Sequence, residues 1–212
     1  MKISYLGHAS FLIESGGKYL LTDPCDERCG YRPWTEPVDI VTVSHGHYDH
    51  NAVEHLKGNP RIIKEQITPI EAGGFTIQGF RSYHDKKQGQ ERGFNYIYKL
   101  TAENINLLHM GDQGTLLDQK LLEQIGQVDI VMVPVGGRYT VDAAEAVQIV
   151  SQLNPSIVIP MHYKTPQGTV DVAPVEKFIS QYEQVVKRPA LTVTCQELPE
   201  ALQVIVLELT DH

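Results

Sequence analysis

The chain has 212 residues, 42% of them hydrophobic and 21% charged, which is an ordinary composition for a soluble globular protein. Its 18 Lys and Arg residues against 26 Asp and Glu residues give a formal net charge of −8, which argues against a protein that binds a nucleic-acid backbone. We therefore expect one domain over residues 1–212 and a small-molecule partner. The net charge does not exclude an anionic partner, because bound divalent ions can dominate the local field of a site.

The first quarter of the chain is predicted to be β-sheet. Short strands are expected at residues 2–6, 10–14 and 18–22, with Gly16 and Gly17 in the hairpin turn between the last two. The continuous apolar run at residues 39–44 is typical of a strand covered on both faces. A short helix is predicted at residues 51–57, ending before Pro60.

The rest of the chain divides into an antiparallel half and a half where helices and strands alternate. Further strands are predicted at residues 61–65, 68–72, 74–83, 94–100, 104–110, 129–134, 156–161 and 204–209, and helices at residues 115–125, 142–153 and 172–185. This order predicts a layered α/β protein in which helices flank the sheets.

The stretch VTVSHGHYDHN at residues 41–51 places three histidines and an aspartate directly after a buried strand. His45 and His47 are two residues apart, so in extended backbone both project to one side and could hold one metal ion. Asp49 and His50 follow in the turn and could face a second ion. Imidazole suits zinc, iron and similar metals, and carboxylate suits harder ions or a bridging role.

Three further candidate ligands follow other predicted strands. His84, Asp112 and His162 each come at a strand end, where side chains of open sheets converge. Together with the four residues of the HGHYDH motif they give seven ligands, which is enough for two metals if Asp112 is shared. Metals about 3.5–4 Å apart form a hydrolytic site in which a bridging water of lowered pKa is the nucleophile.

HGHYDH, the later HMGD and PMHY resemble the metallo-β-lactamase superfamily. SYLGHASFLIESGGKYLLTDP and VPVGGRYTVDAAEA…IPMHYKT resemble its ascorbate-6-phosphate-lactonase-like branch of metal-dependent hydrolases, over residues 2 to 165. The resemblance implies a four-layer αβ/βα sandwich, with two mixed sheets flanked by helices.

The resemblance also implies an assignment of the ligands. His45, His47 and His84 would bind the first metal, and Asp49, His50 and His162 the second, with Asp112 as the bridge. Asp49 would in addition orient the attacking hydroxide. His84 departs from the pattern because many relatives have a glycine before this histidine, whereas it stands here in SYHD. His109 is its nearby competitor, but it shares a strand end with Asp112 and would approach the ion from a crowded position.

Three more residues are candidates for a role beside the metal ligands. His8 is expected near the site as a catalytic residue, with a backbone-bonded histidine as the alternative. Asp23 is expected to orient a ligand histidine or to tie loops beneath the metals, although an Asp-Pro turn explains it nearly as well. Asp85 either does similar work or faces solvent. Cys25 and Cys29 are expected to be free thiols in a loop.

Arg138, Tyr139 and Lys164 are candidates to bind an anionic group of the substrate, against the alternative of solvated loop residues. The pocket is expected to be open and built from loops around residues 32–34, 86–92 and 136–139. No glycine-rich loop with a P-loop lysine precedes a helix, so nucleotide hydrolysis of that kind is excluded.

The leading hypothesis is a hydrolase that uses two divalent metal ions to activate a hydroxide against a small ester, lactone, amide or phosphodiester. Zinc is preferred, and manganese or iron remains open. Asp49, metal-bound water or His8 could protonate the leaving group. The alternatives are a mononuclear iron oxygenase or other redox enzyme, a nuclease disfavoured by the net charge, and a non-catalytic metal-binding module.

Localisation is predicted from the absence of export signals. The start of the sequence lacks an apolar stretch followed by a small-residue cleavage site, and no run of about 20 apolar residues occurs. An odd count of three cysteines fits a reducing cytoplasm. We expect a cytoplasmic protein with no membrane partner, and a homo-oligomer stays open.

Overall fold

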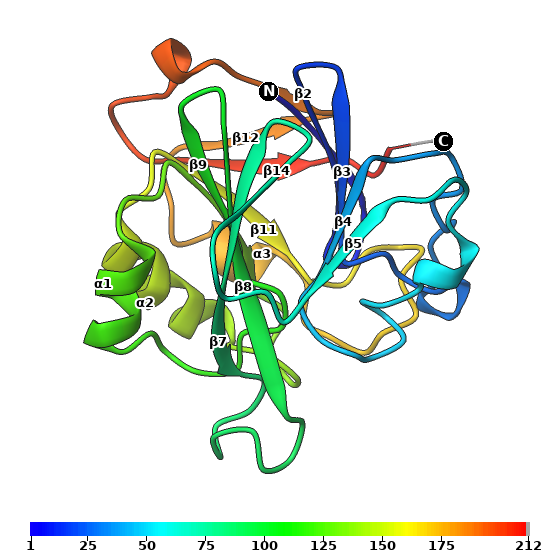
Figure 1. The fold of residues 1–212 in the computed structure, drawn as a ribbon. Helices are drawn as coiled ribbons and strands as arrows, with labels where there is room; N and C mark the ends of the chain where they lie inside the picture. Colours follow the sequence, from blue (N-terminus) through cyan, green and yellow to red (C-terminus); the bar gives the residue numbers. More distant parts are fainter. Residues whose placement is uncertain (211–212) are drawn as a thin grey trace.

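The computed structural model describes residues 1–210, which form two mixed β-sheets packed against each other (Figure 1). The first sheet has six strands in the order β13-β1-β2-β3-β4-β5. Its strands are β1 (Lys2–Gly7), β2 (Ser10–Ser15), β3 (Lys18–Thr22), β4 (Ile40–Val43), β5 (Arg61–Lys64) and β13 (Leu191–Thr192). The hairpin between β2 and β3 turns at Gly16 and Gly17, as predicted.

The second sheet has eight strands in the order β12-β14-β11-β10-β9-β8-β7-β6. Its strands are β6 (Ile70–Ala72), β7 (Phe75–Tyr83), β8 (Phe94–Ala102), β9 (Ile105–His109), β10 (Ile130–Pro134), β11 (Ile157–Met161), β12 (Val185–Arg188) and β14 (Gln203–Leu207). β6 to β9 pair antiparallel, and β9, β10, β11, β14 and β12 pair parallel. The sequence predicts an antiparallel half followed by a half in which helices and strands alternate, and the change between them falls within this one sheet.

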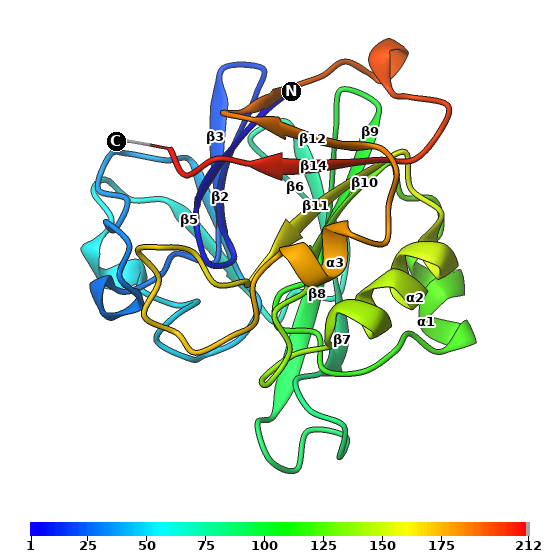
Figure 2. The ribbon, with the colours of Figure 1, turned by 180° about the vertical axis from the view of Figure 1, so that it is seen from behind.

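The three α-helices follow strands of the second sheet and lie beside it (Figure 2). They are α1 (Gln119–Ile125), α2 (Ala143–Leu153) and α3 (Glu176–Ile179). α2 begins with a capping box, in which the Asp142 carboxylate accepts from the N–H of Glu145 and the Glu145 carboxylate accepts from the N–H of Asp142. Its buried face, which includes Ala146, Ile149 and Val150, packs into the main core.

The main core lies between the two sheets. Tyr5, Phe11 and Ile13 from the first sheet and Phe75 and Tyr98 from the second belong to one buried cluster, and each is at most 1% exposed. Because alternate residues of each strand face this layer, the predicted period-2 patterning determines which side chains meet there. The fold class predicted from the sequence, two mixed sheets with helices, is confirmed, although the helices are few.

Two predicted helices are wrong in extent. The segment 51–57 contains only a 3₁₀ turn, Val53–His55, after which Leu56 returns to extended backbone. The segment 172–185 contains only α3. Its beginning pairs instead with other loops, since the N–H of Ala173 donates to Gly136, and its end joins β12. In the segment 172–185 the N–H of Lys164 also takes the carbonyl of Ala173, which a helix would use for its own ladder.

Within residues 1–210, no helix has the length and apolarity required to cross a membrane.

Replacing Asp142 by alanine should destabilise the fold through α2. The substitution leaves the N–H of Glu145 without its cap, and such a loss costs about 1 kcal/mol of unfolding free energy. Denaturant unfolding of the variant measures the change. Glu183→Ala, at an exposed position outside any helix cap, is the control and should unfold like the wild type. Equal stability of the two variants would contradict the role of the capping box.

Candidate metal centre

Histidines and carboxylates from distant parts of the sequence gather where β1, β4, β7, β9 and β11 end. His8 follows β1, and the HGHYDH motif follows β4. His84 follows β7, Asp112 comes shortly after β9, and His162 follows β11. Strand ends bring these side chains together because the sheets hold the strands in register.

Three residues of this region adopt left-handed backbone that non-glycine residues rarely take. The φ angles are 56° at His8, 36° at Asp23 and 53° at His162. Backbone hydrogen bonds hold two of them, since the N–H of His162 donates to the carbonyl of His8 at 2.8 Å. Strained positions persist only where the surroundings determine them, and they concentrate at functional sites.

The first group of candidate ligands comprises His45, His47 and His84. One ring nitrogen from each lies within 4.8 Å of the others. Nε2 of His45 is 3.0 Å from Nδ1 of His47, and the rings of His45 and His84 are edge to face with centroids 4.6 Å apart. The structure therefore brings together the three histidines that the sequence assigns to a first metal.

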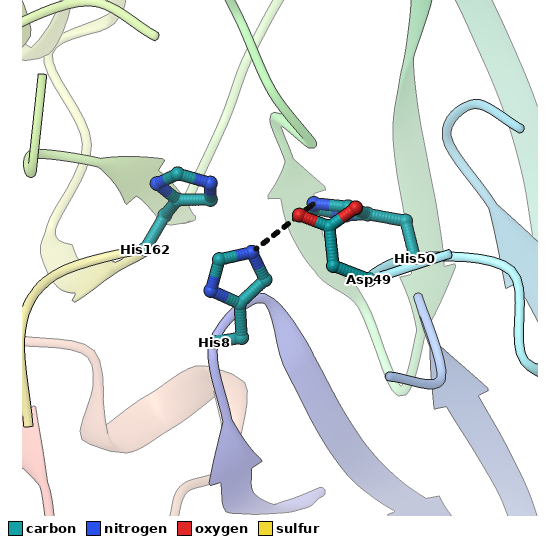
Figure 3. Close-up of side chains that lie close together, drawn as sticks. All are labelled: His8, Asp49, His50 and His162. Atoms are coloured by element: carbon teal, nitrogen blue, oxygen red, sulfur yellow. Dashed lines mark hydrogen bonds and ion pairs between the residues drawn. The ribbon is translucent and has the colours of Figure 1, made fainter. Parts of the chain in front are cut away.

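The second group comprises His8, Asp49, His50 and His162 (Figure 3). Oδ2 of Asp49 lies 3.2 Å from Nε2 of His8 and 3.8 Å from Nε2 of His50. The rings of His8 and His162 are 4.1 Å apart at their centroids. This group contains the three residues assigned to a second metal, together with His8.

Asp112 lies between the two groups and is 2% exposed. Its Oδ2 is 3.2 Å from Nε2 of His84 in the first group and 3.4 Å from Nε2 of His162 in the second. Its Oδ1 is 3.1 Å from Nε2 of His50. One carboxylate thus faces imidazoles of both groups, which is the position that a bridging ligand requires.

The donor atoms of this cluster fit metal ions better than they fit one another. Within residues 1–210, no hydrogen bond satisfies Nε2 of His50, both ring nitrogens of His84 and His162, or Oδ1 of Asp112, although all are buried. Buried polar groups without partners are costly and rare in folded proteins. Several of them directed at one small region match the imidazole and carboxylate donors that zinc, manganese and iron accept.

Gly111 permits the placement of Asp112. Its φ angle is 53°, and a β-carbon there would clash with Oδ1 of Asn95 and with the side chain of Ser44. Oδ1 of Asn95 accepts the N–H of Asp112 at 2.9 Å, and its Nδ2 donates to the carbonyl of Met110 at 2.9 Å. The glycine in HMGD therefore allows the chain to turn beneath the candidate bridging carboxylate.

Asp23 lies directly beneath the cluster and is fully buried. Its Oδ2 is 2.7 Å from Nδ1 of His50 and accepts the hydroxyl of Ser44 at 2.5 Å, and its Oδ1 accepts the N–H of Ser44 at 2.7 Å. The Ser44 hydroxyl is in turn 3.0 Å from Nδ1 of His45. Asp23 thus orients one histidine of each group, so that Nε2 of both rings faces the candidate ion sites.

Opposite charges in the cluster shift the pKa values of its members. Burial lowers the pKa of His50, but Asp112 and Asp23 raise it well above the ordinary value. Burial likewise raises the pKa of Asp112, and His162 and His50 bring it well below the usual range. The carboxylates are therefore ionised, and in the metal-free protein His50 carries a proton that a bound cation would displace.

His8 and Asp49 form a different kind of pair. Burial, together with His162, lowers the pKa of His8 to about 4, so its ring is neutral at pH 7. Burial raises the pKa of Asp49, but the hydrogen bond from His8 and the charge of His50 lower it below the usual value. Asp49 is therefore an ionised acceptor for a neutral imidazole N–H.

His109 and Asp85 take roles that do not involve the cluster. His109 is fully buried, its Nε2 lies 2.8 Å from the carbonyl of Ala9, and its Nδ1 accepts the N–H of Gly111. Both of its nitrogens are thus used, and His84 is the histidine that joins the cluster. Asp85 does not orient a histidine, because its oxygens accept backbone N–H groups of the loop at residues 87–92.

Cys25 and Cys29 are free thiols, as predicted, and both are buried beside Tyr31.

A cavity of about 470 Å³ opens beside the cluster. His47, Asp49, His84 and Asp112 form its floor, and its other lining residues are Tyr48, Arg92, Tyr139, Thr169, Val170 and Asp171. Of the three predicted substrate-binding residues, only Tyr139 lines this cavity.

Arg138 and Lys164 do not line the cavity, and each already has a partner. Arg138 forms an ion pair with Asp171, and the ammonium of Lys164 donates to the carbonyl of Gly168 at 2.5 Å. Sequence reasoning did not select Arg92, Tyr48 or Thr169 as binding residues. The only signal for Arg92 was its place at the end of a loop expected near the pocket.

Residues 2–162 match the beta-lactamase superfamily domain. The chain belongs to this superfamily. Among its relatives in the superfamily, a UPF0173 metal-dependent hydrolase of Carboxydothermus hydrogenoformans is 33% identical over 194 residues, which cover 78% of this chain and 85% of the relative. The predicted superfamily is confirmed.

Solved structures agree with the fold described above. A Thermotoga maritima protein described as a Zn-dependent hydrolase of the metallo-beta-lactamase superfamily is 33% identical, with a TM-score of 0.82 and 97% of each chain covered. CmlA, a diiron beta-hydroxylase from Streptomyces venezuelae, shares only the fold, at 15% identity and a TM-score of 0.58 over 76% of this chain and 44% of its own. The chain is a metal-dependent hydrolase of the metallo-β-lactamase fold.

Replacing Asp23 by asparagine should weaken metal binding without removing a ligand. An amide has one acceptor oxygen, so it cannot accept the N–H of Ser44 on one side and the Ser44 hydroxyl and His50 on the other, as the carboxylate does. Loss of such outer partners typically lowers metal affinity about 10- to 100-fold. Competition with a chelator measures the affinity. Asp129→Asn is the control, since Asp129 also accepts several hydrogen bonds but lies away from the cluster. Equal affinities in both variants would refute the orienting role.

His84→Ala and His109→Ala should have different consequences. Removal of His84 is expected to reduce bound metal per chain, because its ring faces Asp112 and two other candidate ligands. Removal of His109 should lower the unfolding temperature while leaving the metal content unchanged, because its nitrogens bond to backbone. Elemental analysis and thermal unfolding of both variants separate the two effects, and the reverse pattern would reassign the ligand.

Proposed function

We propose that this chain hydrolyses a small anionic ester, lactone or phosphodiester at a centre of two divalent metal ions. His45, His47 and His84 hold one ion, Asp49, His50 and His162 hold the other, and Asp112 bridges them. His8 stands beside the second ion's ligands. Zinc is the preferred metal because most donors are imidazoles, with manganese or iron as alternatives.

The observation that carries the proposal is the position of Asp112. A carboxylate that serves one ion faces one set of ligands, whereas Asp112 is within 3.4 Å of a histidine from each group. It also lines the cavity, so the substrate can reach the point where the two groups meet. Two ions at such a centre supply Lewis acidity to the substrate and lower the pKa of bound water.

Asp49 is the residue placed to handle a proton. It lines the cavity, it is ionised, and one of its oxygens holds the N–H of His8 at 3.2 Å. Because its pKa is lowered, Asp49 does not hold a proton itself, but it can orient the attacking water and relay a proton from it to the leaving group. His8 is neutral and lies under Asp49, so its role is to position that carboxylate rather than to act as the acid itself.

The size and lining of the cavity support a small substrate. About 470 Å³ lies at the lower end of the range for ligand pockets, and loops rather than an additional domain form its walls. The lactonase-like branch that the sequence resembles suggests a phosphorylated, sugar-derived lactone or a cyclic phosphodiester. That suggestion rests on analogy, because a fold hosts many substrates.

The second candidate is a redox enzyme, and the likeness to the diiron hydroxylase concerns the fold alone. A mononuclear iron oxygenase needs only one ligand group, and this chain has complete donor sets in both groups. A non-catalytic metal-binding module would not require the open cavity above the cluster. Both alternatives remain outcomes of the test.

The test is elemental analysis of the purified protein, followed by hydrolysis assays on esters, lactones and phosphodiesters. We expect about two zinc or manganese ions per chain, as is usual for bridged two-metal sites, and hydrolysis that a chelator abolishes. Asp112→Ala should lose most of the metal and reduce activity by at least about 100-fold. A single iron would support the redox alternative. No metal, even after incubation with zinc or manganese, would leave a binding module.

A further inference from the structure

The loop between β7 and β8 is held in one shape by Asp85. Its two carboxylate oxygens accept the backbone N–H groups of Lys87, Gly89, Glu91 and Arg92 at 2.8–3.1 Å. The loop is also tied to α2, where the ammonium of Lys86 lies 2.6 Å from a Glu145 oxygen. The position of Arg92 at its end is therefore determined by the fold rather than left to a mobile segment.

Arg92 lies in the cavity wall and stacks on Tyr139. Its guanidinium carbon is 4.4 Å from the centre of the Tyr139 ring, and both residues line the cavity beside the metal-ligand cluster. An aromatic ring under a guanidinium holds its plane in place while the N–H groups at the edge stay available. The side chain is thus oriented before any ligand arrives.

The charge of Arg92 is not matched by a carboxylate. Nearby acids have other partners, since Asp171 pairs with Arg138 and Glu91 pairs with Lys87. Asp85 is occupied by backbone N–H groups. In the part of the chain that the structure describes, the Arg92 guanidinium has no ion pair and no hydrogen bond.

We propose that Arg92 is the specificity-determining residue, binding an anionic group of the substrate, a carboxylate or a phosphate, that is remote from the bond hydrolysed. The proposal rests on the proposed function and names its substrate class: a molecule with a reactive ester, lactone or phosphodiester at one end and a separate anion at the other. The planar guanidinium fork matches both carboxylate and phosphate. Arg138 and Lys164 are less suited, because each already has a partner.

The test uses dicarboxylates as probes, because one carboxylate can reach the metal centre while the other reaches Arg92. Isothermal titration of the metal-loaded protein with succinate, glutarate and adipate is compared with titration by acetate, which has no second anion. We expect at least one dicarboxylate to bind more tightly than acetate. In Arg92→Gln its affinity should fall about tenfold, the effect of one exposed charge-assisted contact, while acetate binding stays unchanged.

Arg81→Gln is the matched control. Arg81 is also an exposed arginine stacked on an aromatic ring, 4.5 Å from the centre of Phe94, but it does not line this cavity. The control should bind every probe like the wild type. Equal losses in the two variants would show a general effect of surface charge and would overturn the proposal.

A second readout is hydrolysis of a neutral acetate ester and of the matching ester that carries a remote carboxylate. Wild type and Arg81→Gln should favour the carboxylated ester through KM. Arg92→Gln should lose this preference, because its KM for the carboxylated ester rises towards that for the neutral ester. A preference that survives Arg92→Gln would overturn the role of the arginine.

Failure of the proposed function would look different. If the protein binds metal but hydrolyses neither ester, the hydrolase reading fails, while the dicarboxylate titrations still report on Arg92. If the metal-loaded wild type binds no dicarboxylate more tightly than acetate, the anion site is refuted whatever the hydrolysis shows.

Discussion

The rest of the structure depends on one buried carboxylate surrounded by imidazoles. Asp112 faces His50, His84 and His162, which come from three separate strand ends, and all are nearly inaccessible to solvent. Several buried polar atoms of this cluster form no hydrogen bond within residues 1–210, which is unfavourable because buried polar groups need partners. The two sheets hold it together, and metal binding would satisfy it. The same arrangement that makes the metal-free centre costly therefore makes it a strong ligand for cations.

Neighbouring residues hold these buried polar groups in place. Asp23 and Ser44 fix the rings of His45 and His50 from below, and Asn95 fixes the backbone of Asp112. The left-handed backbone of Asp23 shows how narrowly the loops are determined. These residues are not candidate metal ligands, but each orients the side chain or the backbone of a residue that is. The large apolar core between the sheets supplies the stability that such strain requires.

The sequence predicted the strands and the ligand cluster better than it predicted helices and pocket walls. Period-2 patterning and buried apolar runs are local signals, so β1 to β11 were found close to their observed bounds. The segment 172–185 has a helical pattern, but backbone bonds to Gly136 leave only α3. HGHYDH has a spacing with a direct chemical meaning. No sequence pattern identifies Arg92 as a binding residue, because it reaches the cavity only when loops distant in sequence meet. The hydrogen bonds of Asp85 to its own loop likewise could not be predicted.

The candidate metal ligands and the proposed anion-binding residues come from different parts of this fold. The ligand cluster stands on strand ends and on a loop packed against them, which makes it rigid, whereas Arg92, Tyr139 and Asp171 come from three loops linked by stacking and an ion pair. Exposed contacts of this kind contribute little to stability, so their residues can change without loss of the fold. A metal centre of fixed geometry can then serve different substrates through different loops. Because one fold hosts many functions, we expect the walls of the cavity, rather than the fold, to determine which substrate binds.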